Sequence, residues 1–182
     1  MKKVLVIMAP GFEEIETVTV VDILRRAGGR VTVVGIVPGV IEGSRGISMV
    51  PDTSLDAINP DAFDLVVLPG GQPGTDNLGK DPRVLEILKN MDKAGKQIAA
   101  ICAAPKVLHA AGLLQNKRIT SHPSIRDQFP ESRYCEDRVV VDGNIITSRS
   151  PGTAMEFAMK LVDILFGRER LQVVNNGVMA LL

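Results

Sequence analysis

The chain has 182 residues, and its 21 basic and 21 acidic residues cancel at neutral pH. A single domain over residues 1–182 can bury about 70% of its unfolded surface without disulfides or a structural metal. The balanced charge and an aromatic content of 3% argue against nucleic-acid binding, because no net positive charge attracts nucleic acid and few side chains can stack on bases. We therefore expect a small molecule or another protein as the partner, and no sequence-specific nucleic acid.

The N-terminus and the cysteines bear on cellular location. Residues 1–11 combine two lysines with a short apolar run, but acidic residues follow at once, which is atypical of a secretory signal. No uninterrupted apolar stretch reaches the roughly 18 residues of a membrane span. The two cysteines, Cys102 and Cys135, do not make a disulfide framework. These observations predict a cytoplasmic protein that does not enter the membrane.

Strand and helix patterns alternate along the chain. An apolar run at 4–8, a helical stretch at 13–27 and a second apolar run at 31–37 predict the start of a right-handed parallel α/β unit. Residues 40–50 are interrupted by glycines and predict a short hairpin or excursion, which can reach towards a partner subunit. This opening favours a parallel sheet with helices on its faces.

The remainder of the chain continues the pattern. Further strands are expected at 64–68, 97–101 and 118–121, a hairpin at 139–147, and helices at 105–112, at 153–166 and from residue 81 onwards. The apolar tail from residue 171 to residue 182 needs cover. The alternation predicts a doubly wound α/β sandwich with a mostly parallel central sheet, in which a site forms beyond the carboxyl ends of the strands.

Cys102 stands between the apolar run at 97–101 and the helical pattern at 105–112. A residue at a tight strand-to-helix turn is pushed out of the sheet, and the first amides of the helix stabilise negative charge beside it. The alternative is a small core side chain, because free cysteine is among the most buried residue types. The setting favours a nucleophile whose thiol pKa is lowered by the helix N-terminus.

Glu16 belongs to the first turn of the helix expected at 13–27, where acids usually complement the helix dipole in solvent. It lies about 120° around the helix from Asp22, which marks the exposed face, so Glu16 leans inward. A carboxyl held against apolar surroundings stays partly protonated, which suits it to hydrogen-bond a thiolate or to shuttle a proton. Glu16 is therefore the candidate partner of Cys102.

Gly70 and Gly71 follow the strand at 64–68, where glycines more often ease a tight turn than bind a ligand. If that strand neighbours the cysteine strand, both glycine amides can join the amide of Ala103 in holding a developing oxyanion. Neither a Walker lysine pattern nor G-x-G-x-x-G is present, so a phosphate loop is not expected.

The chain has only two histidines. His109 falls in the helix after Cys102 and is expected to pack. His122 precedes a proline in a loop and can approach the site, the alternative being a loop histidine bonded to backbone. With two histidines and two cysteines scattered along the chain, we expect no zinc site, and nothing in the sequence calls for a cofactor.

Five segments together resemble the ThiJ/PfpI superfamily, and within it the branch of the Parkinsonism-associated protein DJ-1 and its bacterial relatives. They are residues 11–17 (GFEEIET), 68–71 (LPGG), 99–105 (AAICAAP), 121–123 (SHP) and 147–153 (TSRSPGT). The resemblance spans essentially the whole chain, and the acidic helix start together with the A-A-I-C-A-x-P pattern is its most specific part.

This resemblance implies a flavodoxin-like sandwich that forms a homodimer. It implies Cys102 as the reactive cysteine, with Glu16 as its carboxyl partner and His122 beside them. Gly71 and Ala103 would supply amides at the site. Family members are described as cofactor-independent glyoxalases of methylglyoxal or glyoxal, as deglycases of early glycated amines and thiols, and as redox-responsive protective proteins and chaperones.

Two differences from related families narrow the place of this chain within the superfamily. The peptidase-like PfpI branch places histidine directly after the nucleophile, whereas Ala103 stands there in this chain. Related glutamine amidotransferases use a histidine late in the chain, and none follows His122. A peptidase or amidotransferase triad is therefore not expected.

The resulting prediction is an enzyme of the glyoxalase III or deglycase type, a lyase or hydrolase without a redox cofactor. Cys102 would add to the aldehyde of a dicarbonyl or act on an early glycation adduct, Glu16 would shuttle a proton, and His122 would assist. The alternative is an oxidative-stress sensor or redox-regulated chaperone, in which Cys102 is oxidised to a sulfinate held by Glu16 and backbone amides.

Overall fold

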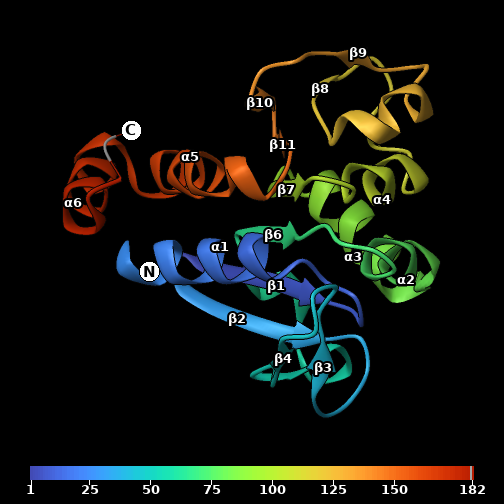
Figure 1. Ribbon diagram of the computed structural model, residues 1–182, viewed down its shortest axis with the longest axis horizontal. Coiled ribbons are helices and arrows are strands. Elements are labelled where there is room, and N and C mark those ends of the chain that lie inside the picture. The colour runs from blue at the N-terminus through green and yellow to red at the C-terminus, as the bar shows by residue number, and fades with distance from the viewer. Residues whose placement is uncertain (181) are drawn as a thin grey trace.

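The computed structural model describes residues 1–180 and 182, so Leu181 of the apolar tail lies outside the described residues. Its centre is a seven-stranded sheet (Figure 1). In spatial order the strands are β10 (Val139–Asp142), β11 (Ile145–Ser148), β7 (Gln97–Ile101), β6 (Leu65–Leu68), β1 (Lys3–Met8), β2 (Arg30–Gly35) and β5 (Thr53–Ser54). All neighbours are parallel except β10 and β11, which form the predicted hairpin. The prediction of a mostly parallel doubly wound sheet is confirmed.

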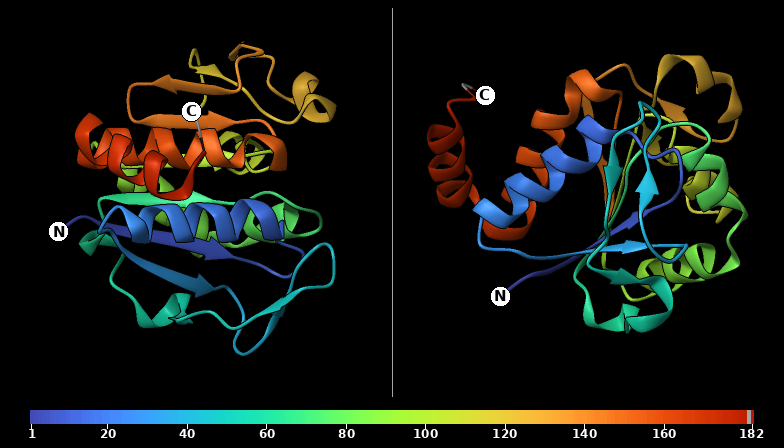
Figure 2. Two further views of the ribbon diagram at one scale, coloured as in Figure 1. Left: turned by 60° about the vertical axis from the view of Figure 1, so that its left-hand side comes forward. Right: turned by 60° about the horizontal axis from the view of Figure 1, so that its bottom comes forward.

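Helices cover both faces of this sheet, as Figure 2 shows. One face carries α1 (Glu14–Arg26) and α5 (Ala154–Phe166), with α6 (Arg168–Val178) packed on the outside of α5. The other face carries α2 (Gly74–Lys80), α3 (Pro82–Lys93) and α4 (Pro105–Ala110). Within residues 1–180 and 182, no helix combines the length and apolarity needed to cross a bilayer.

Strand periodicity explains the two-layer core. Along β1, Leu5 and Ile7 point to the face of α3 and α4, whereas Val4, Val6 and Met8 point to the face of α1 and α5. All five side chains are fully buried. A strand with both faces covered is apolar at every position rather than at alternate ones, which is why its sequence is a continuous run.

Some elements differ from the sequence expectation. The strand expected at 118–121 is only β8 (Arg118–Ile119), and it pairs with β9 (Arg133–Tyr134) in a separate two-stranded sheet. The excursion at 40–50 is a hairpin of β3 (Ile41–Glu42) and β4 (Ser48–Met49). The polar helix α2 and the edge strand β5 were not predicted, because neither is long enough to show a hydrophobic period.

The order of the strands sets the position of the site. The chain moves from β1 outward to β2, and then returns to place β6 on the other side of β1. Such a reversal leaves a crevice beyond the carboxyl ends of the strands, because successive loops turn away from each other. The loops after β1, β6, β7 and β11 all emerge at this edge.

Candidate active site

Cys102 follows β7 at the carboxyl edge of the sheet in a left-handed backbone conformation, with φ of 64°. A non-glycine residue in this region costs on the order of 1–3 kcal/mol and persists only when its surroundings hold it. Two hydrogen bonds do so: the Cys102 N–H donates to the Ser148 carbonyl at 3.0 Å, and the Cys102 carbonyl accepts from the His122 N–H at 2.8 Å. The strained turn projects the thiol into the crevice, as the strand-to-helix setting predicts.

Glu16 is fully buried beneath the thiol. Its Oε2 accepts the Gly70 N–H at 2.7 Å, while its Oε1 has no hydrogen-bond partner among the described residues. The first turn of α1 is held by Glu13, whose Oε2 accepts the Glu16 N–H at 2.7 Å. Glu16 therefore points into the sheet edge rather than into solvent, as its helical position indicates.

Burial raises the pKa of the Glu16 carboxyl from 4.5 to about 7; the nearby Glu13 charge adds to this, while the Gly70 N–H and the Cys102 thiol oppose it. The pKa of the Cys102 thiol is also raised, from 9.0 to about 12. Burial is the largest cause, and the charge of Glu16 and the hydrogen bond to Glu16 raise the pKa further. The Ala103 and Gly71 amides act in the opposite direction.

These shifts correct the expectation that the helix N-terminus lowers the thiol pKa. The helix α4 spans only Pro105–Ala110. Burial and the neighbouring Glu16 raise the thiol pKa by more than the Ala103 and Gly71 amides lower it. Protonation of Glu16 removes the neighbouring charge and turns the carboxyl into a hydrogen-bond donor, so it favours the thiolate. The thiol and the carboxyl therefore titrate as a coupled pair that retains a proton through neutral pH.

The amides near the thiol divide into two groups. Gly71 and Ala103 line the cavity around Cys102, and their N–H groups act on the sulfur. The Gly70 N–H donates to Glu16 instead, so our expectation that it faces an oxyanion is wrong. Gly70 serves the site by its lack of a side chain, since a Cβ there would lie 2.7 Å from both the Cys102 Cβ and the Glu16 Oε2.

His122 reaches the cavity, although the strand before it lies outside the central sheet. Its backbone bond to Cys102 brings it there, and its Nδ1 lies 2.7 Å from the Ser124 Oγ at the start of the 3-10 helix Pro123–Gln128. The ring is thus oriented by a local polar contact. His109 packs edge-on against Phe129 and is not part of the site, as expected.

The cavity above the thiol has a volume of about 610 Å³. It is lined by Glu13, Ile15, Ser44, Arg45, Gly71, Gln72, Cys102, Ala103, His122, Ser124, Ile125 and Pro151. Sequence reasoning missed Ser44 and Arg45, which the β3–β4 hairpin brings to the cavity. It also missed Glu13. A polar residue directly before a helix often caps it, and this position could have indicated the role of Glu13.

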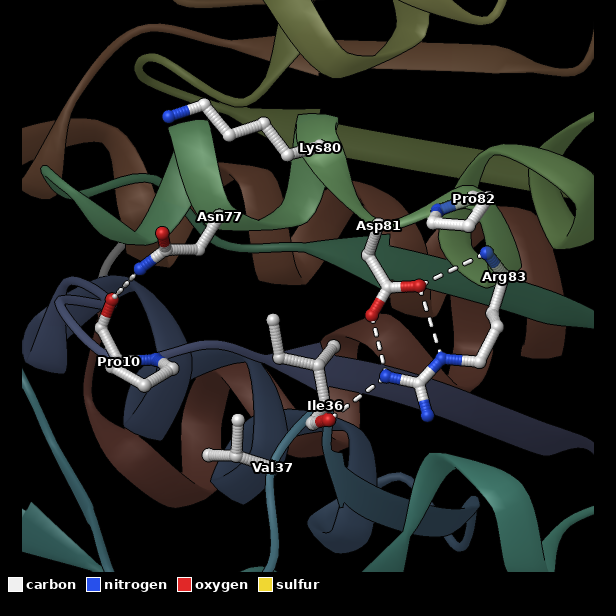
Figure 3. Close-up of a pocket in the computed structure, with 8 residues that line it drawn as sticks. All are labelled: Pro10, Ile36, Val37, Asn77, Lys80, Asp81, Pro82 and Arg83. Carbon is white, nitrogen blue, oxygen red and sulfur yellow. Dashed lines mark hydrogen bonds and ion pairs between the residues drawn. The ribbon is translucent and has the colours of Figure 1, made fainter.

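A second pocket of about 530 Å³ lies beside the ends of β1 and β2 (Figure 3). It is lined by Pro10, Ile36, Val37, Asn77, Lys80, Asp81, Pro82 and Arg83. The Arg83 guanidinium already donates hydrogen bonds to Asp81, to Asp56 and to the Ile36 carbonyl. This pocket lies where α2 and α3 meet the sheet. The coupled acid and thiol instead mark the cavity above Cys102 as the candidate active site.

Comparison with known proteins identifies the family of this chain. Residues 2–164 match the model of the DJ-1/PfpI family. The chain is 46% identical to protein dj-1beta of Drosophila melanogaster, over 98% of this chain and 97% of that protein. It is 38% identical to a Caenorhabditis elegans protein named glutathione-independent glyoxalase DJR-1.2, over 93% and 91% of the two chains.

Solved structures show the same similarity in three dimensions. The crystal structure of Drosophila melanogaster DJ-1beta superposes with a TM-score of 0.95, covering 98% of this chain and 97% of that one at 46% identity. The structure described as oxidised Toxoplasma gondii DJ-1 also gives a TM-score of 0.95, at 37% identity and 98% coverage of both chains. A family match over most of the chain, together with these full-length relatives, establishes that the chain belongs to the DJ-1/PfpI family.

Proposed function

We propose that the protein is a cofactor-independent glyoxalase or deglycase, which converts methylglyoxal, glyoxal or early glycation adducts into hydroxy acids through Cys102. The observation that carries this proposal is the coupled pair of Cys102 and Glu16 at the floor of an open cavity. A relative named as a glutathione-independent glyoxalase supports the same activity. The pair supplies both a nucleophile and a proton carrier, which the reaction requires.

The reaction begins when the Cys102 thiol passes its proton to Glu16 and the sulfur adds to the aldehyde carbon of methylglyoxal. Glu16 passes this proton to the aldehyde oxygen, which gives a hemithioacetal and restores the Glu16 carboxylate. Glu16 then removes the proton from this carbon, and the resulting enediol is reprotonated at the neighbouring carbon. Oxidation at one carbon thus balances reduction at the next, and a thioester of lactate remains on Cys102.

Water hydrolyses the thioester and releases lactate with the free thiol. The Gly71 and Ala103 amides are placed to stabilise oxygen charge during addition and hydrolysis. His122, oriented by Ser124, is placed at the cavity to assist proton transfer. A Glu16 pKa of about 7 suits repeated proton exchange at neutral pH, since an effective acid and base has a pKa near the working pH.

The direct test is lactate formation from methylglyoxal by the purified protein, without glutathione. We expect lactate to accumulate through many turnovers per protein chain, and to fall by a factor on the order of 1,000 in Cys102→Ser, because serine lacks an accessible anionic form at neutral pH. Cys135→Ser is the matched control and should retain turnover. Stoichiometric consumption without lactate would contradict the proposal.

A second candidate function is that of an oxidation sensor or redox-regulated chaperone. The amides of Gly71 and Ala103 and the buried Glu16 carboxyl surround the sulfur with groups able to hydrogen-bond a sulfinate. A structural relative described as oxidised supports this candidate. Turnover separates the two functions, because a sensor consumes oxidant once per thiol and does not produce lactate.

We also propose a homodimer, formed through α1 and the β3–β4 hairpin. Ile15, Val18, Ile47 and Val50 are all about half exposed or more on these two adjacent elements. Part of the tail is already covered, because Val174 is buried against α5, so the tail contributes less free surface than its sequence indicates. Exposed aliphatic side chains gathered in this way are typical of an interface between subunits.

For this dimer, light scattering at micromolar concentration should give twice the chain mass. Val50 is 73% exposed. The Val50→Glu protein should be monomeric, because a dimer would bury an unpaired carboxylate at this position. Val173 on α6 is 61% exposed and provides the control: Val173→Glu should remain dimeric. Dissociation by the Val173 substitution alone would place the interface on the tail instead.

A further inference from the structure

The tip of the β3–β4 hairpin, residues 43–47, forms one wall of the cavity. Its strands, Ile41–Glu42 and Ser48–Met49, contribute only two residues each. The tip is closed by the Gly43 N–H donating to the Ile47 carbonyl at 2.9 Å. So short a hairpin is not stable by itself in water, so its position depends on contacts with the rest of the protein.

Glu14 provides several of these contacts from the first turn of α1. The residue is almost completely buried, at 4% exposure. Oε1 accepts the Arg45 N–H at 2.7 Å and the Ile47 N–H at 3.3 Å, and Oε2 accepts the Ser44 hydroxyl at 3.2 Å. A carboxylate with three donors from one loop holds that loop far more tightly than a neutral acceptor does.

The fit between carboxylate and hairpin is close on both sides. Gly43 lies against Glu14, and a Cβ at this glycine would overlap the carboxyl group. Burial alone would raise the pKa of Glu14, but the amides of Arg45 and Ile47 and the Ser44 hydroxyl outweigh it and lower the pKa. Glu14 is therefore ionised and fully occupied by the hairpin at neutral pH.

Other contacts anchor different parts of the hairpin. The Gly11 N–H donates to the Glu42 carbonyl at 2.8 Å, and the Ser44 N–H donates to the Phe12 carbonyl at 2.7 Å. These bonds hold the ascending side of the hairpin. Within one chain, the descending side of the tip is held by Glu14, through the Arg45 and Ile47 amides.

Arg45 is the charged residue that this arrangement brings to the site. It lines the cavity with Cys102, and its charge acts on the buried Glu13 carboxyl, whose pKa is raised by burial and partly restored by Arg45. Across the described part of the chain, the Arg45 guanidinium takes part in no ion pair. It is thus available to a ligand in the cavity.

We propose that Glu14 is a positioning residue, which fixes the hairpin tip so that Arg45 stands at the mouth of the Cys102 cavity and favours the approach of negatively charged electrophiles. The consequence for substrate choice rests on the proposed function: dicarbonyl substrates that carry a carboxylate are favoured over neutral ones of equal reactivity. The structural part of the proposal does not depend on turnover.

The test compares alkylation of Cys102 by iodoacetate, an anion, with alkylation by neutral iodoacetamide, followed by peptide mapping. Arg45→Gln should lower the iodoacetate to iodoacetamide rate ratio by about threefold to tenfold, the size of a single partly screened charge a few ångströms away. Glu14→Gln should lower the ratio by a similar factor. It should also speed hydrogen exchange of the Arg45 and Ile47 amides at least about tenfold.

The direction of the change in rate ratio is diagnostic. Removing an acid near the thiol would by itself raise the iodoacetate ratio, so a fall can come only from displacement of Arg45. Glu42→Gln is the matched control, because Glu42 is an exposed acid of the same hairpin, and it should leave both the ratio and the exchange rates at wild-type values.

Gly43→Ala displaces the tip from the hairpin side while Glu14 keeps its charge. It should lower the ratio as Glu14→Gln does, which keeps the test valid if one variant folds poorly. An unchanged or raised ratio in Glu14→Gln, with wild-type exchange at Arg45 and Ile47, would overturn the proposal. Neither the alkylation ratio nor hydrogen exchange requires turnover, so a failure of the glyoxalase proposal is recognised separately, by the absence of lactate.

Discussion

Gly70→Ala is expected to reduce methylglyoxal turnover by a factor on the order of 100 or more. The new Cβ would stand 2.7 Å from the Cys102 Cβ and 2.7 Å from the Glu16 Oε2, far inside van der Waals contact. Neither neighbour is the free end of a flexible chain, because one belongs to the strained turn and the other is buried. A displacement of about 1 Å between reacting groups is enough for a loss of this size.

The effect of this substitution is steric, since Gly70 is not among the glycines with positive φ. Overpacking should also cost about 1–3 kcal/mol of unfolding free energy. Gly79→Ala is the matched control: its Cβ would lie 3.9 Å from Val107, an ordinary contact, and alanine favours helix. Lactate production and thermal midpoint should be measured for both variants. Turnover near that of wild type in Gly70→Ala would show that the thiol and carboxyl do not require their observed spacing.

Much of the fold could be predicted from the sequence because the central strands carry the signal themselves. β1, β6 and β7 are buried on both faces and are continuous apolar runs, and α1 and α5 each show one apolar face. The strand expected at 118–121 was overestimated, because Arg-Ile-Thr-Ser carries no such continuous apolar run. It is short and pairs outside the central sheet, a distinction that hydrophobicity alone cannot make.

The site could be predicted where chemistry and local geometry coincide in one segment. Cys102 stands at a strand-to-helix turn, and the position of Glu16 on its helix indicates burial. The roles of Gly70 and Arg45 could not be predicted, because they depend on contacts between segments far apart in sequence. Gly70 meets Glu16 across 54 positions, and Arg45 meets Glu14 across 31.

Glu16→Gln is the variant in which the two readings of this residue differ most. If Glu16 only complements the helix dipole, the substitution should cost at most about 1 kcal/mol and leave turnover nearly intact. If Glu16 carries the proton between the two carbons, turnover should fall by a factor on the order of 100 or more, because an amide cannot exchange protons in this way. We expect the second result.

The structure adds an expectation for stability. Because burial raises the pKa of Glu16 from 4.5 to about 7, the folded protein retains a proton there that the unfolded chain has lost over this range. Stability therefore falls as the pH rises from about 4.5 to about 7, by roughly a few kcal/mol. Above that range, Glu16→Gln should be at least as stable as wild type, because it does not bury a charge.

Cys102 should still add to methylglyoxal in Glu16→Gln. The charge of Glu16 and the hydrogen bond to it raise the thiol pKa in the wild type, and both are removed, so formation of the thiolate becomes easier. With no proton carrier the hemithioacetal cannot be converted into the enediol. A Cys102 adduct with the mass of one methylglyoxal should therefore accumulate. The activity of the wild type should also titrate near pH 7, and this inflection should be absent from any residual activity of the variant.

Lactate production, intact mass and thermal midpoint should be measured on one preparation between pH 5 and pH 9, a range of about two units on either side of the Glu16 pKa. Asp22→Asn is the matched control, because Asp22 lies on the same helix with its side chain 53% exposed, and it should behave as wild type. A Glu16→Gln protein that makes lactate at close to the wild-type rate would remove Glu16 from the mechanism. The sulfur and its surrounding amides would then be better explained as an oxidation sensor than as the site of an enzyme.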